Sequence, residues 1–217
     1  MPALDTTKTD NLRATSCPDI RQAPDNTLTR ADAAETAALV ETVRKAQRGD
    51  EDAQRTLILN YQHRIAGFIY TIVNHTAPVE DLAQTVFIKM LHALPKLDQP
   101  AQFEAWLFRL ARNASIDHIR HERWQRLFTP IETEDRVLEI PDRNTGIDAE
   151  ELDALHHALS KLKPKDRALI ALAQEGRAQD EMAAITGVTI TTLKTRLHRA
   201  REQLKHHYEP ASKIRIS

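Results

Sequence analysis

The sequence predicts an all-α protein: two small helical domains joined by a flexible acidic linker, the C-terminal one with a helix-turn-helix. Three observations support this fold class. Apolar residues recur at helical spacing through most of the chain after residue 39. Only 5% of the 217 residues are aromatic, and long stretches lack the alternation of β-strands. Residues 129–153 hold nine acids against two arginines and contain Pro130, Pro141 and Gly146, as expected of a linker.

The first domain is expected to hold four helices after a flexible tail. Residues 1–34 mix Thr, Asp, Asn and Pro without a period, which predicts the tail. Gly49 and Asp50 separate a short helix from a long one, and Pro78 and Pro95 bound a third. The expected helices cover about 39–47, 51–73, 79–94 and 103–124.

The second domain is expected to end in two helices joined by a tight turn. After helices starting near Asp148 and Lys165, Gly187 can supply a left-handed turn residue and Thr189 can cap the last helix. The inner face of this helix-turn-helix would be formed by Met182, Ala183, Ile185, Leu193, Leu197 and Ala200.

The last helix has the composition of a DNA recognition helix. Between Lys194 and Lys205 five cations stand against one acid, a net +4, and hydroxyls accompany them. Cations bind phosphates, and hydroxyls can read base edges in a major groove. The alternative is a helical hairpin with a basic, solvated face. The candidate DNA-binding residues are Thr189, Thr191, Thr192, Lys194, Thr195, Arg196, His198 and Arg199.

The second half of the helix over 103–124 is also basic. From Arg109 to Arg126 five arginines stand against two acids, with His118, His121 and Trp124 interleaved. An exposed ring can stack on a base while arginines follow the backbone, which suits single-stranded nucleic acid. A solvated helix end explains the same residues equally well.

Other functional classes lack support in the sequence. Cys17 is the single cysteine, so an intramolecular disulfide is excluded. Histidines lie at His118 with His121 and in pairs at 156/157 and 206/207, but no carboxylate or thiol completes a metal set, so no metal or cofactor is expected. No nucleophile, carboxylate pair or glycine-rich loop indicates an enzyme. Without a signal peptide or an apolar run of 18 residues, we expect a cytoplasmic protein with no membrane span.

Three strings carry a family resemblance. EDLAQTVFIKMLHAL (80–94), FEAWLFRLARNASIDHIRHERW (103–124) and KPKDRALIALAQEGRAQDEMAAITGVTITTLKTRLHRAREQL (163–204) together resemble the extracytoplasmic-function sigma factors of bacterial RNA polymerase. The resemblance implies a region 2 domain over 35–126, a linker over 127–147, a region 4 domain over 148–209 and a tail over 210–217. It implies a promoter-specificity subunit with core RNA polymerase and promoter DNA as partners, held by an anti-sigma factor.

The resemblance also assigns residues. Core polymerase would meet Glu80, Asp81, Gln84 and Phe87. The minus-ten promoter element would be melted and read by Arg112, Asn113, Asp117, Arg120, His121, Arg123 and Trp124, with the loop over 98–102 beside a flipped base. The helix from Thr189 would read the minus-thirty-five element. Two departures from the family pattern are Thr85, where an acid is usual, and Ala178, where Ser or Thr commonly caps the helix.

Two rival hypotheses remain at this point. A dimeric regulator with a C-terminal helix-turn-helix would bind an operator without polymerase, but it leaves the strings at 80–94 and 103–124 unexplained. A helical adaptor that mimics a sigma factor would bind proteins only, and it predicts loss of recognition-helix cations such as Arg196 and Arg199, which are present.

Overall fold

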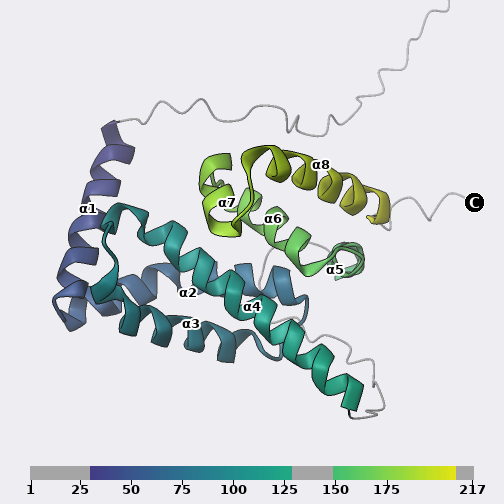
Figure 1. The fold of residues 1–217 in the computed structure, drawn as a ribbon, viewed down its shortest axis with the longest axis horizontal. Helices are drawn as coiled ribbons and strands as arrows, with labels where there is room; N and C mark the ends of the chain where they lie inside the picture. The colour runs from purple at the N-terminus through teal and green to yellow at the C-terminus, as the bar shows by residue number, and fades with distance from the viewer. Residues whose placement is uncertain (1–29, 129–148, 209–217) are drawn as a thin grey trace, which may run out of the picture.

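The computed structural model describes residues 30–128 and 149–208, and within these ranges the chain is helical without strands (Figure 1). The predicted fold class is confirmed for this part of the chain. The α-helices are α1 (Arg30–Gln47), α2 (Glu51–Val73), α3 (Val79–Ala93), α4 (Phe103–Phe128), α5 (Ala149–Ser160), α6 (Pro164–Gln174), α7 (Gln179–Thr186) and α8 (Ile190–His207). Two short 3-10 helices, Leu94–Lys96 and Pro100–Gln102, connect α3 to α4.

Two helix ends differ from the predicted boundaries. Helix α1 begins at Arg30, inside the stretch predicted as tail, because residues 30–38 are rich in Ala, which favours helix without forming a stripe of large apolar residues. Helix α4 continues to Phe128, past the expected end of the domain at residue 126. The predicted linker and the two predicted tails otherwise lie outside the described residues.

Local capping chemistry sets the start of α2, the end of α7 and the start of α8, as predicted. The Asp50 side chain accepts a hydrogen bond from the Ala53 amide at 2.9 Å and caps α2. Thr189 caps α8 by accepting from the Thr192 amide. Gly187 ends α7 in the left-handed conformation, with φ of 71°, and so forms the tight turn between the two helices.

The first helical unit packs around α2, which contacts α1, α3 and α4. Its buried stripe includes Leu57, Ile65 and Ile69, as the spacing predicts, together with Phe68. The Phe68 ring meets the Phe108 ring edge-on at 5.1 Å between centroids, which ties α2 to α4. A single apolar core therefore fixes the helices that carry the candidate sites.

The second unit consists of α5 to α8, and the helix-turn-helix is α7 and α8. The inner face predicted for it is confirmed, because Met182, Ala183, Ile185, Leu193, Leu197 and Ala200 are all buried. Helix α8 rests on α6 and α7 and lies along the outside of the unit (Figure 1).

The two units pack against each other, with α6 against α2 and α7 against α4. The buried Arg167 of α6 donates from Nε to the Ile72 carbonyl at 2.7 Å, at the C-terminal end of α2. Carbonyls in the last turn of a helix lack intrahelical partners and carry partial negative charge, so a cation is favoured there. Burial lowers the pKa of Arg167 to about 10, and the nearby Arg123 charge adds to this effect, yet the guanidinium stays protonated at neutral pH.

Helix α7 offers a test of the capping argument. Its N-cap residue Ala178 has extended backbone angles but supplies no side-chain hydrogen bond. We expect Ala178→Ser to raise the free energy of unfolding by about 1 kcal/mol, because the hydroxyl can accept from a first-turn amide. Thermal and denaturant unfolding would measure the gain. The control is Ala184→Ser, at an exposed interior position of the same helix, which should give no gain. An equal gain from both variants would contradict the argument.

Candidate functional site

Helix α8 presents most of its predicted DNA-binding residues to solvent. The exposed members are Thr191, Thr192, Lys194, Thr195, His198 and Arg199. Two predicted residues are already engaged. The Thr189 hydroxyl caps α8. The half-buried Arg196 donates a hydrogen bond from Nη2 to Oδ1 of Asp166 at 2.5 Å. Arg196 therefore joins α8 to α6, so its DNA-binding assignment needs this ion pair to open.

The second half of α4 carries a second exposed polar face. Asn113, Asp117 and Arg120 are exposed and follow one another at helical spacing, so they lie on one side of the helix. The Arg120 guanidinium lies 3.3 Å from the Asp117 carboxylate. Further along, His121 and Arg123 are exposed and the Trp124 side chain is 63% exposed. The structure thus brings these predicted residues together on one helix.

Arg112 is the exception among the predicted minus-ten residues. It is half-buried, and its NH1 donates to the Asn113 Oδ1 at 2.9 Å. Its Nε is buried without a hydrogen-bond partner among the described residues. Burial lowers the pKa of Arg112, and the charge of Arg196 on α8 lowers it further. Arg112 therefore lies near the second unit rather than on the solvent face of α4.

Helix α3 exposes Glu80, Asp81 and Gln84, as the predicted polymerase-binding face requires. Phe87, predicted on the same face, is only 8% exposed and belongs to the core, so its predicted contact with a partner would need this ring to leave the core. Helical spacing along α3 fits either Ala83 or Phe87 as a core residue, and the larger Phe87 ring occupies the core. Ile88 is instead 56% exposed, one turn after Gln84. The sequence signal for this surface was an isoleucine next to polar residues of α3. The sequence alone did not show whether Phe87 or Ile88 would be exposed.

A network of charged side chains joins the two units. Glu104 at the start of α4 accepts from Arg64 of α2 at 3.0 Å and from Arg177, in the turn between α6 and α7, at 2.5 Å. Arg64 also donates to Glu175 at 2.9 Å, and the Tyr61 hydroxyl donates to Glu104 at 2.6 Å. The Arg177 guanidinium lies over the Phe108 ring, 4.7 Å from its centroid. Sequence analysis named none of these residues for this role.

The network shifts the titration of its members. Burial by itself raises the pKa of Glu104, but hydrogen bonds from Arg177 and Tyr61 outweigh it and bring the pKa down to about 2. Burial and the bond to Glu104 raise the pKa of Tyr61. The Glu104 carboxylate is therefore ionised at neutral pH and holds the positive charges of Arg64 and Arg177.

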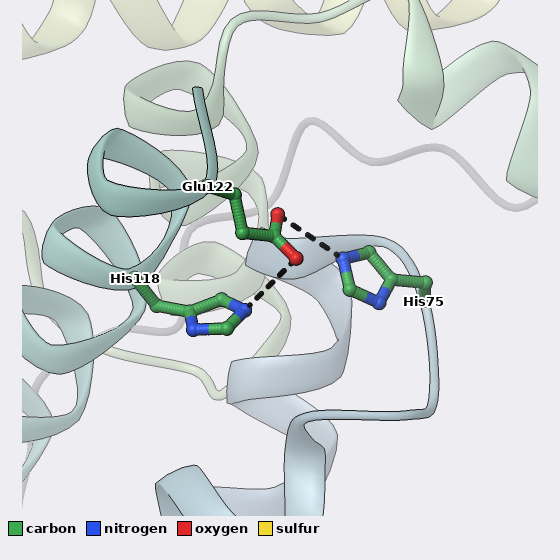
Figure 2. A group of neighbouring side chains, drawn as sticks. All are labelled: His75, His118 and Glu122. Atoms are coloured by element: carbon green, nitrogen blue, oxygen red, sulfur yellow. Dashed lines mark ion pairs between the residues drawn. The ribbon is translucent and has the colours of Figure 1, made fainter. Parts of the chain in front are cut away.

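One group of possible metal ligands occurs among the described residues. His118 lies beside Glu122 and His75 (Figure 2). The carboxylate missing from the sequence-based histidine sets is supplied one helical turn later, and His75 comes from the turn after α2. None of the described helices is both long enough and apolar enough to cross a membrane.

Comparison with known proteins identifies both helical units. The Sigma-70 region 2 family matches residues 57–125, and the Sigma-70 region 4 family matches residues 152–204. The chain belongs to the extracytoplasmic-function sigma factors. It is 29% identical to RNA polymerase sigma-H factor of Pseudomonas aeruginosa over 180 residues, which are 77% of this chain and 92% of that one.

Two further relatives support the assignment. This sigma factor is 32% identical to the factor SigE of Mycolicibacterium smegmatis over 165 residues, which are 73% of this chain and 64% of SigE. The solved structure of CnrH in complex with the cytosolic domain of CnrY superposes with a TM-score of 0.59. That match has 27% identity and covers 78% of this chain and 96% of CnrH.

Family membership gives the biochemical class. Sigma factors bind core RNA polymerase and promoter DNA and direct initiation to specific promoters, without catalysing a reaction themselves. The expectation of a promoter-specific, non-enzymatic initiation factor is therefore confirmed. The rival hypotheses of a dimeric regulator and of a protein-binding adaptor do not account for the two matched regions.

The Glu104 network gives a testable pH dependence. A carboxyl whose folded pKa lies below its unfolded value stabilises the protein at higher pH, and that stabilisation disappears as pH falls. For Glu104 the loss should develop between about pH 4.5 and pH 2. We expect Glu104→Gln to cost about 1–3 kcal/mol at pH 7, because it removes the charge of the acceptor that Arg64 and Arg177 share. Arg177 keeps its second carboxylate partner, Glu181 at 2.8 Å. Denaturant unfolding and the radius of gyration from X-ray scattering would measure the loss.

The matched control is Glu41→Gln. Glu41 lies 3.8 Å from Arg48 in a solvent-exposed pair on α1, and such pairs contribute about 0–1 kcal/mol. Equal losses from Glu104→Gln and Glu41→Gln would contradict a joining role for Glu104.

Proposed function

We propose that three separate exposed faces divide the work of this sigma factor. The face of α3 around Asp81 and Gln84 binds core polymerase, the second half of α4 reads the minus-ten element, and α8 reads the minus-thirty-five element. The supporting observation is that nearly all the implied residues lie on exposed helix faces, each on a helix fixed by the core. Region 2 would span residues 35–126 and region 4 residues 148–209.

We propose that the polymerase-binding face of α3 uses a different apolar residue from the one that the resemblance implies. Asp81, Gln84, Thr85 and Ile88 are exposed and lie along one stripe of α3, at helical spacing. Ile88 replaces the buried Phe87 as the apolar contact of this stripe. An exposed apolar residue ringed by polar ones is typical of a protein interface.

For the minus-ten element, α4 supplies both kinds of contact that single-stranded DNA needs. Asn113 and Asp117 offer hydrogen-bonding groups to bases, Arg120 and Arg123 offer charge to phosphates, and the ring of Trp124 can stack. Extruding a base costs a few kcal/mol, which stacking of about 1–3 kcal/mol per base and hydrogen bonds must offset. The loop over 98–102, with Asp98 and Gln99 exposed, would border the extruded base.

For the minus-thirty-five element, α8 would enter the major groove. Thr191, Thr192 and Thr195 lie within its first two turns with Lys194, where recognition helices contact base edges. His198 and Arg199 follow one turn later and would contact the phosphate backbone. Hydroxyls provide the sequence reading, and the cations provide affinity that falls with salt.

Promoter binding requires the two units to separate. The two elements lie roughly 25 base pairs apart by their names, about 85 Å along the helix axis at 3.4 Å per base pair. Helix α4, the longest of the described helices with 26 residues, spans only about 39 Å. Because the units here share a core, they cannot reach both elements at once. We propose that the Glu104 network opens when polymerase and DNA bind.

The remaining partners follow from the class. The similar CnrH structure contains the cytosolic domain of CnrY, and we propose that an anti-sigma factor likewise holds this chain. Because its binding partners are RNA polymerase and chromosomal promoters, we propose that the protein is located in the cytoplasm.

The first test is co-elution of the purified chain with core RNA polymerase on a sizing column. We expect wild type to co-elute and Asp81→Arg and Ile88→Ser to lose binding by at least about tenfold with unchanged thermal midpoints, because both side chains are exposed. Phe87→Ala should instead lower stability by about 3–5 kcal/mol as a buried ring is lost. A wild type that binds duplex DNA but not polymerase would favour the dimeric regulator.

The second test measures promoter affinity of the polymerase complex against salt. We expect Lys194→Ala to reduce the slope of log affinity against log salt by about 1, because one phosphate contact is lost. Thr195→Ala should leave the slope unchanged and alter the preference for one base pair of the minus-thirty-five element. A lysine variant with the wild-type slope would remove α8 as the DNA-binding helix.

A further inference from the structure

Region 2 contains a cluster of three side chains that the assigned functions do not use. His75 lies in the turn between α2 and α3, and His118 and Glu122 lie one turn apart on α4. Figure 2 shows the Glu122 carboxylate between the two imidazole rings. All three side chains are partly buried, with exposed fractions of 33%, 25% and 27%. We propose that His75, His118 and Glu122 bind a divalent transition metal ion, with Zn²⁺ as the best fit.

The distances match a metal site better than they match hydrogen bonds. The His118 Nε2 lies 3.3 Å from one carboxylate oxygen and the His75 Nε2 lies 3.7 Å from the other. Both exceed the usual hydrogen-bond length of about 2.7–3.2 Å. Zinc ligands lie about 2.0–2.2 Å from the metal, which places neighbouring ligands of a tetrahedral site about 3.3–3.6 Å apart. The three ligand atoms lie within 4.8 Å of one another, so small side-chain rotations would close the site.

The chemistry of the donors also agrees with a metal. The His118 Nε2 is buried without a hydrogen-bond partner among the described residues, so its lone pair or proton is unsatisfied. Two imidazoles and one carboxylate form a set found in zinc sites with an open fourth position. Arg126 approaches Glu122 at 3.8 Å, but it is 63% exposed and can turn into solvent.

Metal binding would join the turn after α2 to the helix that reads the minus-ten element. His118 directly follows Asp117 in the chain, and Glu122 directly precedes Arg123. A bound ion would therefore fix the second half of α4 against the turn between α2 and α3. This proposal stands independently of the polymerase and DNA contacts, because its test uses neither.

The test is a zinc titration of the purified full-length chain, previously treated with a chelator, by calorimetry and by competition with a chromophoric chelator. Wild type should bind one tight equivalent, and its thermal midpoint should rise with zinc. His118→Ala and His75→Gln should weaken zinc affinity by more than about 100-fold, because loss of a ligand costs more than the about 10–100-fold typical of losing a residue that only orients a ligand. The thermal midpoints of these variants should not rise with zinc. Cobalt, as a spectroscopic probe, should give the visible absorption of a tetrahedral site in wild type but not in His118→Ala or His75→Gln.

The matched control is the double variant His206→Gln/His207→Gln. These two rings lie 5.1 Å apart near the end of α8 and could collect zinc adventitiously. The double variant should keep the wild-type affinity and midpoint shift. Equal zinc affinity in wild type, His118→Ala and His75→Gln, loss of the site in the double variant, or no binding by wild type would each overturn the proposal. Glu122→Gln, which preserves side-chain volume, provides a third ligand test should His118→Ala lose helicity.

Discussion

The packing of the two sigma regions depends on the carboxylate of Glu104. It is the shared acceptor for Arg64 of region 2 and Arg177 of region 4, and Tyr61 completes its shell. A half-buried carboxylate is costly to desolvate unless cations and donors replace water, and here three groups do so. Tyr61 and Arg64 lie on α2, Glu104 lies on α4 and Arg177 lies in the α6–α7 turn, so the network fixes these three elements together.

Like charges oppose this arrangement. Arg196 of α8 acts on Arg112 of α4, and Arg123 of α4 acts on Arg167 of α6, and in both cases the effect lowers the pKa of the second arginine. The closed packing thus combines a shared apolar core and one acid-centred network, which hold the units together, with two repulsive contacts that oppose them. DNA phosphates neutralise arginines, so the proposed binding of promoter DNA to α4 and α8 would relieve this repulsion. Salt screens exposed charges more than buried ones, so it weakens the attractive and the repulsive contacts between the two units to different extents.

Helix α4 carries several functions because its 26 residues present different faces along their length. Phe103, Leu107 and Ala111 bury one stripe in the region 2 core. Glu104 and Phe108 meet Arg177 of region 4. Beyond that contact Asn113, Asp117 and Arg120 are exposed, and the helix leads to the exposed Trp124. On its other side Ile116 and Ile119 still pack against the core, so the exposed face is held on a fixed helix.

The sequence by itself determined what depends on neighbours within a few residues. The caps at Asp50 and Thr189, the turn at Gly187 and the inner face of the helix-turn-helix follow from backbone geometry and helical period, and the three quoted strings determined the family. Helical spacing fits either Ala83 or Phe87 in the core, and only the tertiary structure decided that the Phe87 ring is buried there while Ile88 is exposed to solvent. It also decided that Arg177 meets Glu104 across 73 residues, and that His75 faces His118 and Glu122. Such contacts depend on how helices with separate periods pack against one another, and no local pattern specifies that packing.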